Sequence, residues 1–262
     1  MNQEERLEYL IAHLLSERQT YCLVPGRTDQ KKRLLRSLMN VRPPAPISQA
    51  FLDIQDDYLK EELASHTITT LKQLKPVQKQ IYLWQGDITK LKVDAIVNAG
   101  NQALLGCFIP CHGCIDNAIH SNAGIQLRLA CQRIMEQQNA PEPTGRAKIT
   151  EGYQLPANYV LHTVGPIVHG TLTKEHCDRL RSCYRSCLEL AQQHRISSLA
   201  FCCISTGEFH FPNQAAAEIA VDTVTDYLER TQSDLEVVFN VFQDQDAAIY
   251  RRLLAADQKA ET

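Results

Sequence analysis

The chain has 262 residues, enough to bury a substantial core as one large domain or as one domain with an appendage. Its composition is that of an ordinary globular protein, and its formal net charge is -3. Because this charge attracts no nucleic acid, and no basic run is interleaved with aromatic residues, we expect no nucleic-acid partner.

The first segment, MNQEERLEYLIAHLLSERQ, carries acids and lacks both a basic leader and a long apolar run. We therefore expect neither a signal peptide nor a membrane span, and a cytoplasmic location. The chain contains 10 cysteines, and two of them, Cys202 and Cys203, are adjacent within an apolar run. Without an export signal, reduced thiols are the expectation.

Residues 1–75 are predicted to form an N-terminal helical extension. Three prolines between residues 43 and 46 break the chain, and Ser48 is expected to cap the helix that follows. We expect the extension to pack against the main domain; a lid or a partner-docking role is the alternative. Apolar residues recur at helical spacing in three stretches, which contain Leu7, Leu10, Ile11, Leu14 and Leu15; Leu34, Leu35, Leu38 and Met39; and Phe51, Leu52, Tyr58, Leu59 and Leu63.

Residues 76–262 are predicted to form a second domain in which short apolar runs alternate with helices. This alternation indicates an α/β fold of three layers with a mixed, largely parallel sheet. In such sheets ligands lie beyond the carboxyl ends of the strands. The expected strands are 81–84, 95–98, 159–164, 199–204 and 236–241, and the expected helices are 116–138, 174–194, 213–230 and 247–256.

Polar residues follow several of these strands. Asp87 could accept hydrogen bonds from a base or cap a turn, and Asn98 and Asn101 could hold sugar hydroxyls or form Asx turns. The segment 205–209 contains a glycine and precedes a helix, a pattern that offers backbone N–H groups to an anion. It is not a Walker P-loop, because the glycine and lysine spacing is absent.

The segment GCFIPCHGC places Cys107, His112 and Cys114 within one loop. Two thiolates and an imidazole are three ligands for one zinc, and a catalytic zinc site keeps its fourth position open. A carboxylate, Asp116, follows two residues later. Cys111 could replace one ligand or close the site as a fourth, and the cysteines could also be ordinary buried residues.

Taken together, GDIT, VDAIVNAGN, DNAIHSNAG with LR, GYQLPANYVLHTVGP and ISTGEFHFP resemble the macrodomain family of ADP-ribose-binding modules over residues 80–256. Where many macrodomains have a glycine-rich run, this chain has GCFIPCHGC, which resembles the zinc-dependent branch of microbial protein ADP-ribose hydrolases. That branch also carries an N-terminal helical extension. The resemblance therefore implies an α/β/α macrodomain with one Zn²⁺ per chain.

By this resemblance, Asp87 would bind the adenine amino group with Ile88 beside it, and Asn101 would lie near the distal ribose. Zinc would lie beside the same ribose. Glu208 departs from the small apolar residue often found at its position, and an acid beside a diphosphate is unfavourable unless its side chain points away. The diphosphate would be wrapped by Ser205, Thr206, Gly207, Glu208 and Phe209.

The resemblance implies hydrolysis that releases ADP-ribose from a mono-ADP-ribosylated protein, with an aspartyl or glutamyl ester as the expected linkage. Asp116 would orient or deprotonate the attacking water, and Asn101 would position the sugar. His120 could share a helix face with Asp116, although a buried structural histidine is the simpler interpretation. A sirtuin-like ADP-ribosyltransferase and a lipoyl-carrying protein are implied companions.

Three other functions remain open from the sequence. The domain could be a non-catalytic reader of ADP-ribosylated proteins, in which the metal only shapes the pocket. It could hydrolyse small ADP-ribose esters instead of protein adducts. It could also be an interaction module stabilised by zinc, which predicts that removing the metal unfolds it.

Overall fold

The structure is a computed structural model that describes residues 1–19 and 23–257. At its centre lies a seven-stranded sheet in the order β2-β3-β9-β8-β5-β7-β6, in which only the two edge strands run antiparallel to their neighbours. The strands are β2 (Pro76–Gln78), β3 (Ile81–Gln85), β5 (Ala95–Gly100), β6 (Ala147–Glu151), β7 (Tyr159–Val164), β8 (Ser198–Phe201) and β9 (Glu236–Val241).

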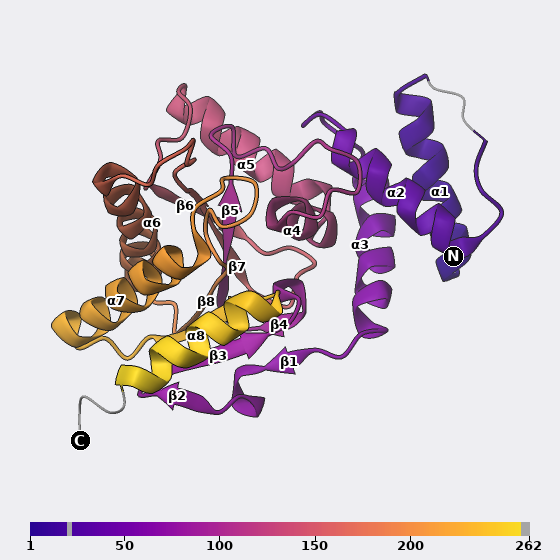
Figure 1. The fold of residues 1–262 in the computed structure, drawn as a ribbon. Coiled ribbons are helices and arrows are strands. Elements are labelled where there is room, and N and C mark those ends of the chain that lie inside the picture. The colour runs from indigo at the N-terminus through magenta and orange to yellow at the C-terminus, as the bar shows by residue number, and fades with distance from the viewer. Residues whose placement is uncertain (20–22, 258–262) are drawn as a thin grey trace.

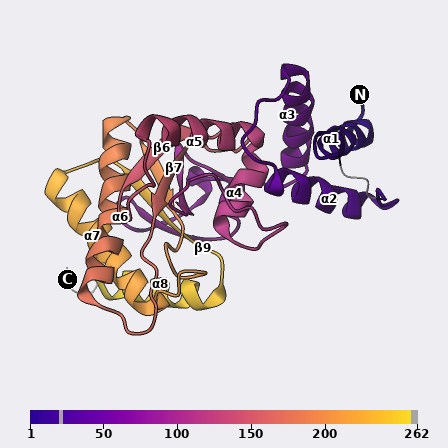
Figure 2. The same ribbon diagram turned by 90° about the horizontal axis from the view of Figure 1, so that it is seen from above.

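Helices cover both faces of this sheet (Figures 1 and 2). One layer consists of α6 (Lys174–Gln193), α7 (Asn213–Thr231) and α8 (Asp244–Asp257), and the other of α4 (Ile115–Ala123) and α5 (Ile125–Gln138). The predicted three-layer α/β/α architecture with a mixed, mostly parallel sheet is therefore confirmed. In the described part of the chain, no helix is both long and apolar enough to cross a membrane.

The N-terminal extension consists of α1 (Gln3–Glu17), α2 (Thr28–Val41) and α3 (Gln49–Ala64), and it lies to one side of the sheet beyond α4 (Figure 1). Its apolar faces form a core of their own, to which Ile125 of α5 contributes. The hydroxyl of Ser48 accepts from the N–H of Phe51 at 3.2 Å, as the capping prediction required. A short parallel pair, β1 (Thr69–Thr70) with β4 (Leu91–Lys92), connects the extension to the sheet domain.

Two predictions about these elements were wrong, and the edge strands of the sheet were missed. The expected helix over residues 116–138 is two helices, because Gly124 has a φ of +97° and separates α4 from α5. The strand expected over residues 199–204 ends at Phe201. The edge strands β2 and β6 were not predicted, since each is short and half exposed and lacks a continuous apolar run.

Strand β7, next to the edge strand β6, carries a buried polar group. His162 of β7 is fully buried, and its two ring nitrogens lie 3.2 Å from Nδ2 of Asn98 and 2.9 Å from the hydroxyl of Thr150. Burial lowers the pKa of His162 to about 4. The folded protein therefore holds this imidazole neutral at pH values where an exposed histidine is charged.

We expect Gly124→Ala to lower the free energy of unfolding by about 1–3 kcal/mol, because a non-glycine residue is strained at this φ. The added Cβ would also lie 2.6 Å from Nε2 of Gln55, which hydrogen-bonds Gln126 across the junction between α3 and α5. Urea unfolding measures the change. Gly26→Ala is the matched control, because its Cβ meets open space; equal stability of the two variants would contradict the prediction.

We expect His162→Gln to weaken the pH dependence of stability. The pKa of His162 lies below its ordinary value, so between about pH 6.5 and 4 the unfolded chain binds a proton that the folded chain excludes. The stabilisation present above that window is lost as the pH falls. When the pH is lowered from about 7.5 to about 5, the free energy of unfolding should fall by about 2 kcal/mol more for the intact chain than for the variant. Parallel urea titrations at both pH values test this, and equal losses would refute it.

Candidate functional site

The three predicted metal ligands lie together in the loop between β5 and α4. We call residues 107–114 the metal loop. The ligand atoms of Cys107, His112 and Cys114 all lie within 4.8 Å of one another, with 3.6 Å between Sγ of Cys107 and Nδ1 of His112. Two thiols and an imidazole at these separations are a donor set that suits zinc.

Cys114 occupies the N-cap of α4, where its sulfur accepts from the N–H of Asn117 at 3.4 Å. Burial raises the pKa of the Cys114 thiol to about 12, and the neighbouring Cys107 adds to this effect. A thiol in this environment does not ionise at neutral pH by itself. A bound cation would supply the positive charge that favours the thiolate, so the residues fit a metal site.

Cys111 lies outside this cluster although it belongs to the same loop. Its backbone is left-handed, with a φ of +51°, and its thiol donates to the carbonyl of Arg33 on α2 at 3.3 Å. The described structure therefore groups three ligands, not four.

Asp116 lies in the first turn of α4, and its carboxylate is buried beside the sheet. Its Oδ1 accepts from Nδ2 of Asn98 at 2.8 Å, which joins two predicted site residues. Burial raises the pKa of Asp116 to about 6, whereas the bond from Asn98 and the charge of Arg128 oppose this rise. A carboxylate whose pKa is close to neutrality is suited to accepting and returning a proton.

His120 is 3.5 Å from Asp116, measured from Nε2 to Oδ1, one helical turn along α4. Its side chain is buried, and burial holds its pKa well below the ordinary value. Neither ring nitrogen has a hydrogen-bond partner in the described structure. His120 is therefore a neutral core residue in this arrangement and contributes no positive charge to Asp116.

Asn101 shapes the turn that leads into the metal loop. Its Oδ1 accepts from the N–H of Ala103 at 3.0 Å, which is an Asx turn, and its Nδ2 donates to the carbonyl of Gly106 at 3.2 Å. Its side chain is half-buried, just before the loop that carries the predicted metal ligands. Both the oxygen and the NH2 group of its side-chain amide therefore already hydrogen-bond the backbone.

The segment 205–209, which we call the anion loop, follows β8. Ser205 has a φ of +67°, and its hydroxyl is buried and has no hydrogen-bond partner among the described residues. Thr206 donates to the carbonyl of Cys203 at 3.1 Å, Gly207 is exposed and Phe209 is half-buried. The 19-residue helix α7 begins after Pro212, which provides no side-chain cap, so its first N–H groups are open to an anion.

Glu208 connects the anion loop to the metal loop. Its carboxylate lies 3.5 Å from Nε2 of His112, whose other nitrogen faces Cys107. From the sequence, Glu208 was expected to be unfavourable beside a diphosphate unless its side chain points away. In the structure this side chain points toward His112. Two motifs that are almost a hundred residues apart in the chain meet at this point.

The two residues predicted to bind adenine differ in their accessibility. Asp87 is exposed, and its Oδ1 accepts from both the N–H and the hydroxyl of Thr89, at 3.0 and 2.7 Å. A carboxylate has further acceptor sites, so this cap leaves Asp87 able to accept from a base. Ile88 is only 2% exposed and packs in the core of the domain.

Sequence reasoning assigned no role to several residues that surround the metal loop, among them Arg36, Asn117 and Arg128. Arg36 donates to Oδ1 of Asn117 and to the carbonyl of His112, and Arg128 donates to the carbonyl of Leu105. The two arginines lie on amphipathic helices and belong to no spacing pattern. Only the LR pair within the family-like motif included Arg128, and it indicated no role.

Comparisons with known proteins match this architecture. The macro domain family matches residues 97–220. A protein-ADP-ribose hydrolase of Treponema medium is 53% identical over 97% of this chain and 100% of its own length. A protein-ADP-ribose hydrolase of Staphylococcus aureus strain MSSA476 is 50% identical over 96% of both chains.

Among solved structures, the Trypanosoma brucei macrodomain in complex with ADP-ribose is similar, with a TM-score of 0.66 and 34% identity. The similarity covers 84% of this chain and 94% of that one. The alignments with the two bacterial hydrolases extend across nearly the whole chain and so include the N-terminal extension. With relatives this similar over their full length, the chain belongs to the macro domain family.

Proposed function

We propose that this protein is a zinc-dependent hydrolase that releases ADP-ribose from mono-ADP-ribosylated protein side chains. The observation that carries the proposal is the meeting of three features at one end of the sheet. These are the Cys107, His112 and Cys114 cluster, the anion loop that reaches it through Glu208, and the buried pair of Asp116 and Asn98. The names of the bacterial relatives support the same reaction class.

The chain's own residues account for substrate binding in this proposal. The anion loop and the start of α7 would hold the diphosphate through backbone N–H groups and the unpaired hydroxyl of Ser205. Asp87 would accept from the adenine amino group, with Ile88 restricted to shaping the floor beneath it. Asn101 would position the distal ribose by fixing the turn beside the metal loop.

Asp116 would orient the attacking water or accept its proton. Its raised pKa of about 6 still leaves it mostly ionised at neutral pH, as a general base requires. Asn98 holds Oδ1 of this carboxylate at 2.8 Å and so restricts its rotation. Cys107, His112 and Cys114 would hold the zinc, which would supply Lewis-acid catalysis at the distal ribose or at the attacking water.

The linkage that best suits this site is an ester to an aspartate or glutamate. A carboxylate leaving group departs without a strong acid to protonate it, and His120, the neighbouring imidazole, is neutral and buried. ADP-ribose and a modified protein are therefore the proposed ligands. A sirtuin-like ADP-ribosyltransferase would supply the modification, and a lipoyl-carrying protein would be its acceptor.

Cys107→Ser should abolish stoichiometric zinc binding and with it the release of ADP-ribose from an acidic-residue-modified protein, because two ligands cannot hold a catalytic zinc. Cys111→Ser is the matched control and should keep both, since its sulfur faces Arg33. Bound zinc is measured by a chromogenic chelator after unfolding, and ADP-ribose release by chromatography.

These measurements also separate the competing functions. An intact chain that binds ADP-ribose and zinc without turnover would be a reader. Turnover confined to small ADP-ribose esters would replace the proposed substrate. A folded Cys107→Ser variant that lacks zinc yet releases ADP-ribose at the rate of the intact chain would refute the zinc mechanism.

Asp116→Asn should lower the rate of ADP-ribose release by about 10²- to 10⁴-fold, the range typical for removing a general base. The amide preserves the shape of the side chain but cannot accept a proton. Zinc content and ADP-ribose affinity, measured by calorimetry, should stay unchanged, because Asp116 is in neither the ligand cluster nor the anion loop. An unimpaired rate at full zinc occupancy would remove Asp116 from the mechanism.

A further inference from the structure

The metal loop has little regular structure of its own. Within it, the carbonyl of Ile109 accepts from the N–H of His112 at 3.3 Å, and the side chains of Phe108 and Ile109 are 39% and 57% exposed. A loop of this kind does not by itself hold three ligand atoms close together. Its support must come from the elements that pack against it.

Arg36 of α2 reaches from the N-terminal extension to the backbone of a ligand. Its guanidinium donates to the carbonyl of His112 at 3.1 Å and to Oδ1 of Asn117 at 2.7 Å. Asn117 in turn donates through Nδ2 to the carbonyl of Ile109 at 3.0 Å and through its backbone N–H to Sγ of Cys114. One arginine thus supports His112 directly and Cys114 through Asn117.

Asn40, one turn further along α2, holds the middle of the loop. Its Oδ1 accepts from the N–H of Cys111 at 2.9 Å, and its Nδ2 donates to the hydroxyl of Ser121 at 2.9 Å. The carbonyl of Arg33 accepts from the Cys111 thiol. Contacts with α2 therefore turn this fourth cysteine away from the three ligands.

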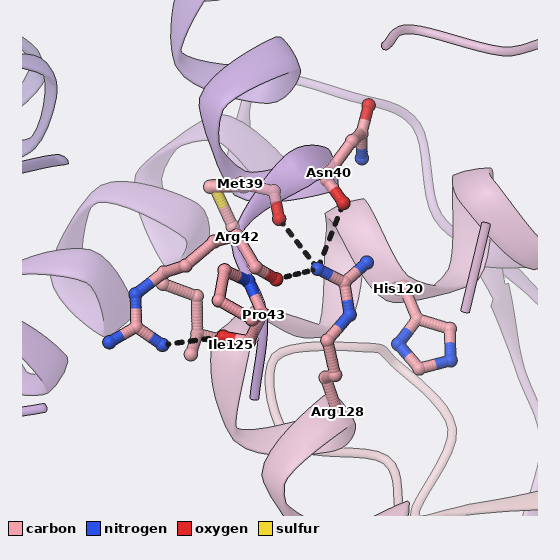
Figure 3. Close-up of a pocket in the computed structure, with 8 residues that line it drawn as sticks. Met39, Asn40, Arg42, Pro43, His120, Ile125 and Arg128 are labelled. Carbon is pink, nitrogen blue, oxygen red and sulfur yellow. Dashed lines mark hydrogen bonds between the residues drawn. The ribbon is translucent and has the colours of Figure 1, made fainter. Parts of the chain in front are cut away.

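Arg128 of α5 fixes the position of α2 itself. In Figure 3 its guanidinium points into the last turn of α2 and donates to the carbonyls of Met39, Asn40 and Arg42. It also lies 4.3 Å from the ring centre of Phe108, within the metal loop. The cavity beside it has a volume of about 10 Å³, room for no more than one water, so the junction is closely packed.

We propose that the N-terminal extension sets the zinc affinity of the site, with Arg36 and Asn40 as positioning residues that hold the metal loop in its ligand-ready arrangement. This inference rests on the proposed function and assigns to the extension a role beyond packing. Without these contacts the loop would have to be ordered by the metal, and the free energy spent on ordering would weaken binding.

Arg36→Met keeps the length of the side chain and removes the donors to His112 and Asn117. We expect zinc binding to weaken by about 10- to 100-fold, as is typical when a residue that orients a metal ligand is lost. Lys32→Met on the same helix is the matched control, because its ammonium pairs with Glu62 inside the extension, at 2.7 Å. Competition with a chromogenic chelator gives the zinc affinities of the full-length chains, and thermal unfolding of the zinc-free chains reports their stability.

Zinc affinity of Arg36→Met equal to that of Lys32→Met would overturn the inference, as would a loss of thermal stability with no change in the zinc affinity of the folded protein. Should Arg36→Met fail to fold without zinc, Arg36→Lys provides the test. A single ammonium cannot span both acceptors as the guanidinium does, so zinc binding should still weaken. Failure of the proposed function has a different signature, because the intact chain would then bind no zinc or release no ADP-ribose.

Discussion

The position of the N-terminal extension on the sheet domain depends on the hydrogen bonds that the buried guanidinium of Arg128 donates to backbone carbonyls. Removing a guanidinium from water is unfavourable, and burial lowers the pKa of Arg128 to about 10. Four backbone carbonyls, from the end of α2 and from Leu105, accept its hydrogen bonds, and the charge of Asp116 favours its cationic form. A helix C-terminus carries partial negative charge and unpaired carbonyls. The cation of Arg128 therefore caps the C-terminus of α2 where this helix meets the sheet domain.

Docking of α2 by Arg128 determines which of its residues face the metal loop. Arg36 and Asn40 lie four residues apart on the same face of this helix, and both contact the loop backbone. This packing determines how many potential ligands cluster. The Cys111 thiol hydrogen-bonds the carbonyl of Arg33 on α2, and only Cys107, His112 and Cys114 of the metal loop lie close together. The coordination available to a metal is thus set by an element that contributes no ligand.

Local patterns in the sequence were sufficient for the parts of the structure that local interactions decide. The central strands are continuous apolar runs, so β5 and β7 were readable, whereas the half-exposed β6 was not. The ligand cluster was also predictable, because Cys107, His112 and Cys114 lie within eight residues. The support of that cluster was not predictable, since Arg36 and Asn117 are 81 positions apart, and the motif that contains Asn117 gives no sign of its partner on α2.

The contact between Glu208 and His112 explains why an acid is tolerated in a loop suited to bind anions. A carboxylate there would repel a diphosphate if it faced the open N–H groups of the loop. Instead it lies 3.5 Å from Nε2 of His112, on the side of the ring away from the thiol of Cys107. In the proposed site this contact would help to orient the imidazole, with its other nitrogen toward Cys107. The carboxylate of Glu208 therefore faces the metal loop, where a bound cation would favour its negative charge.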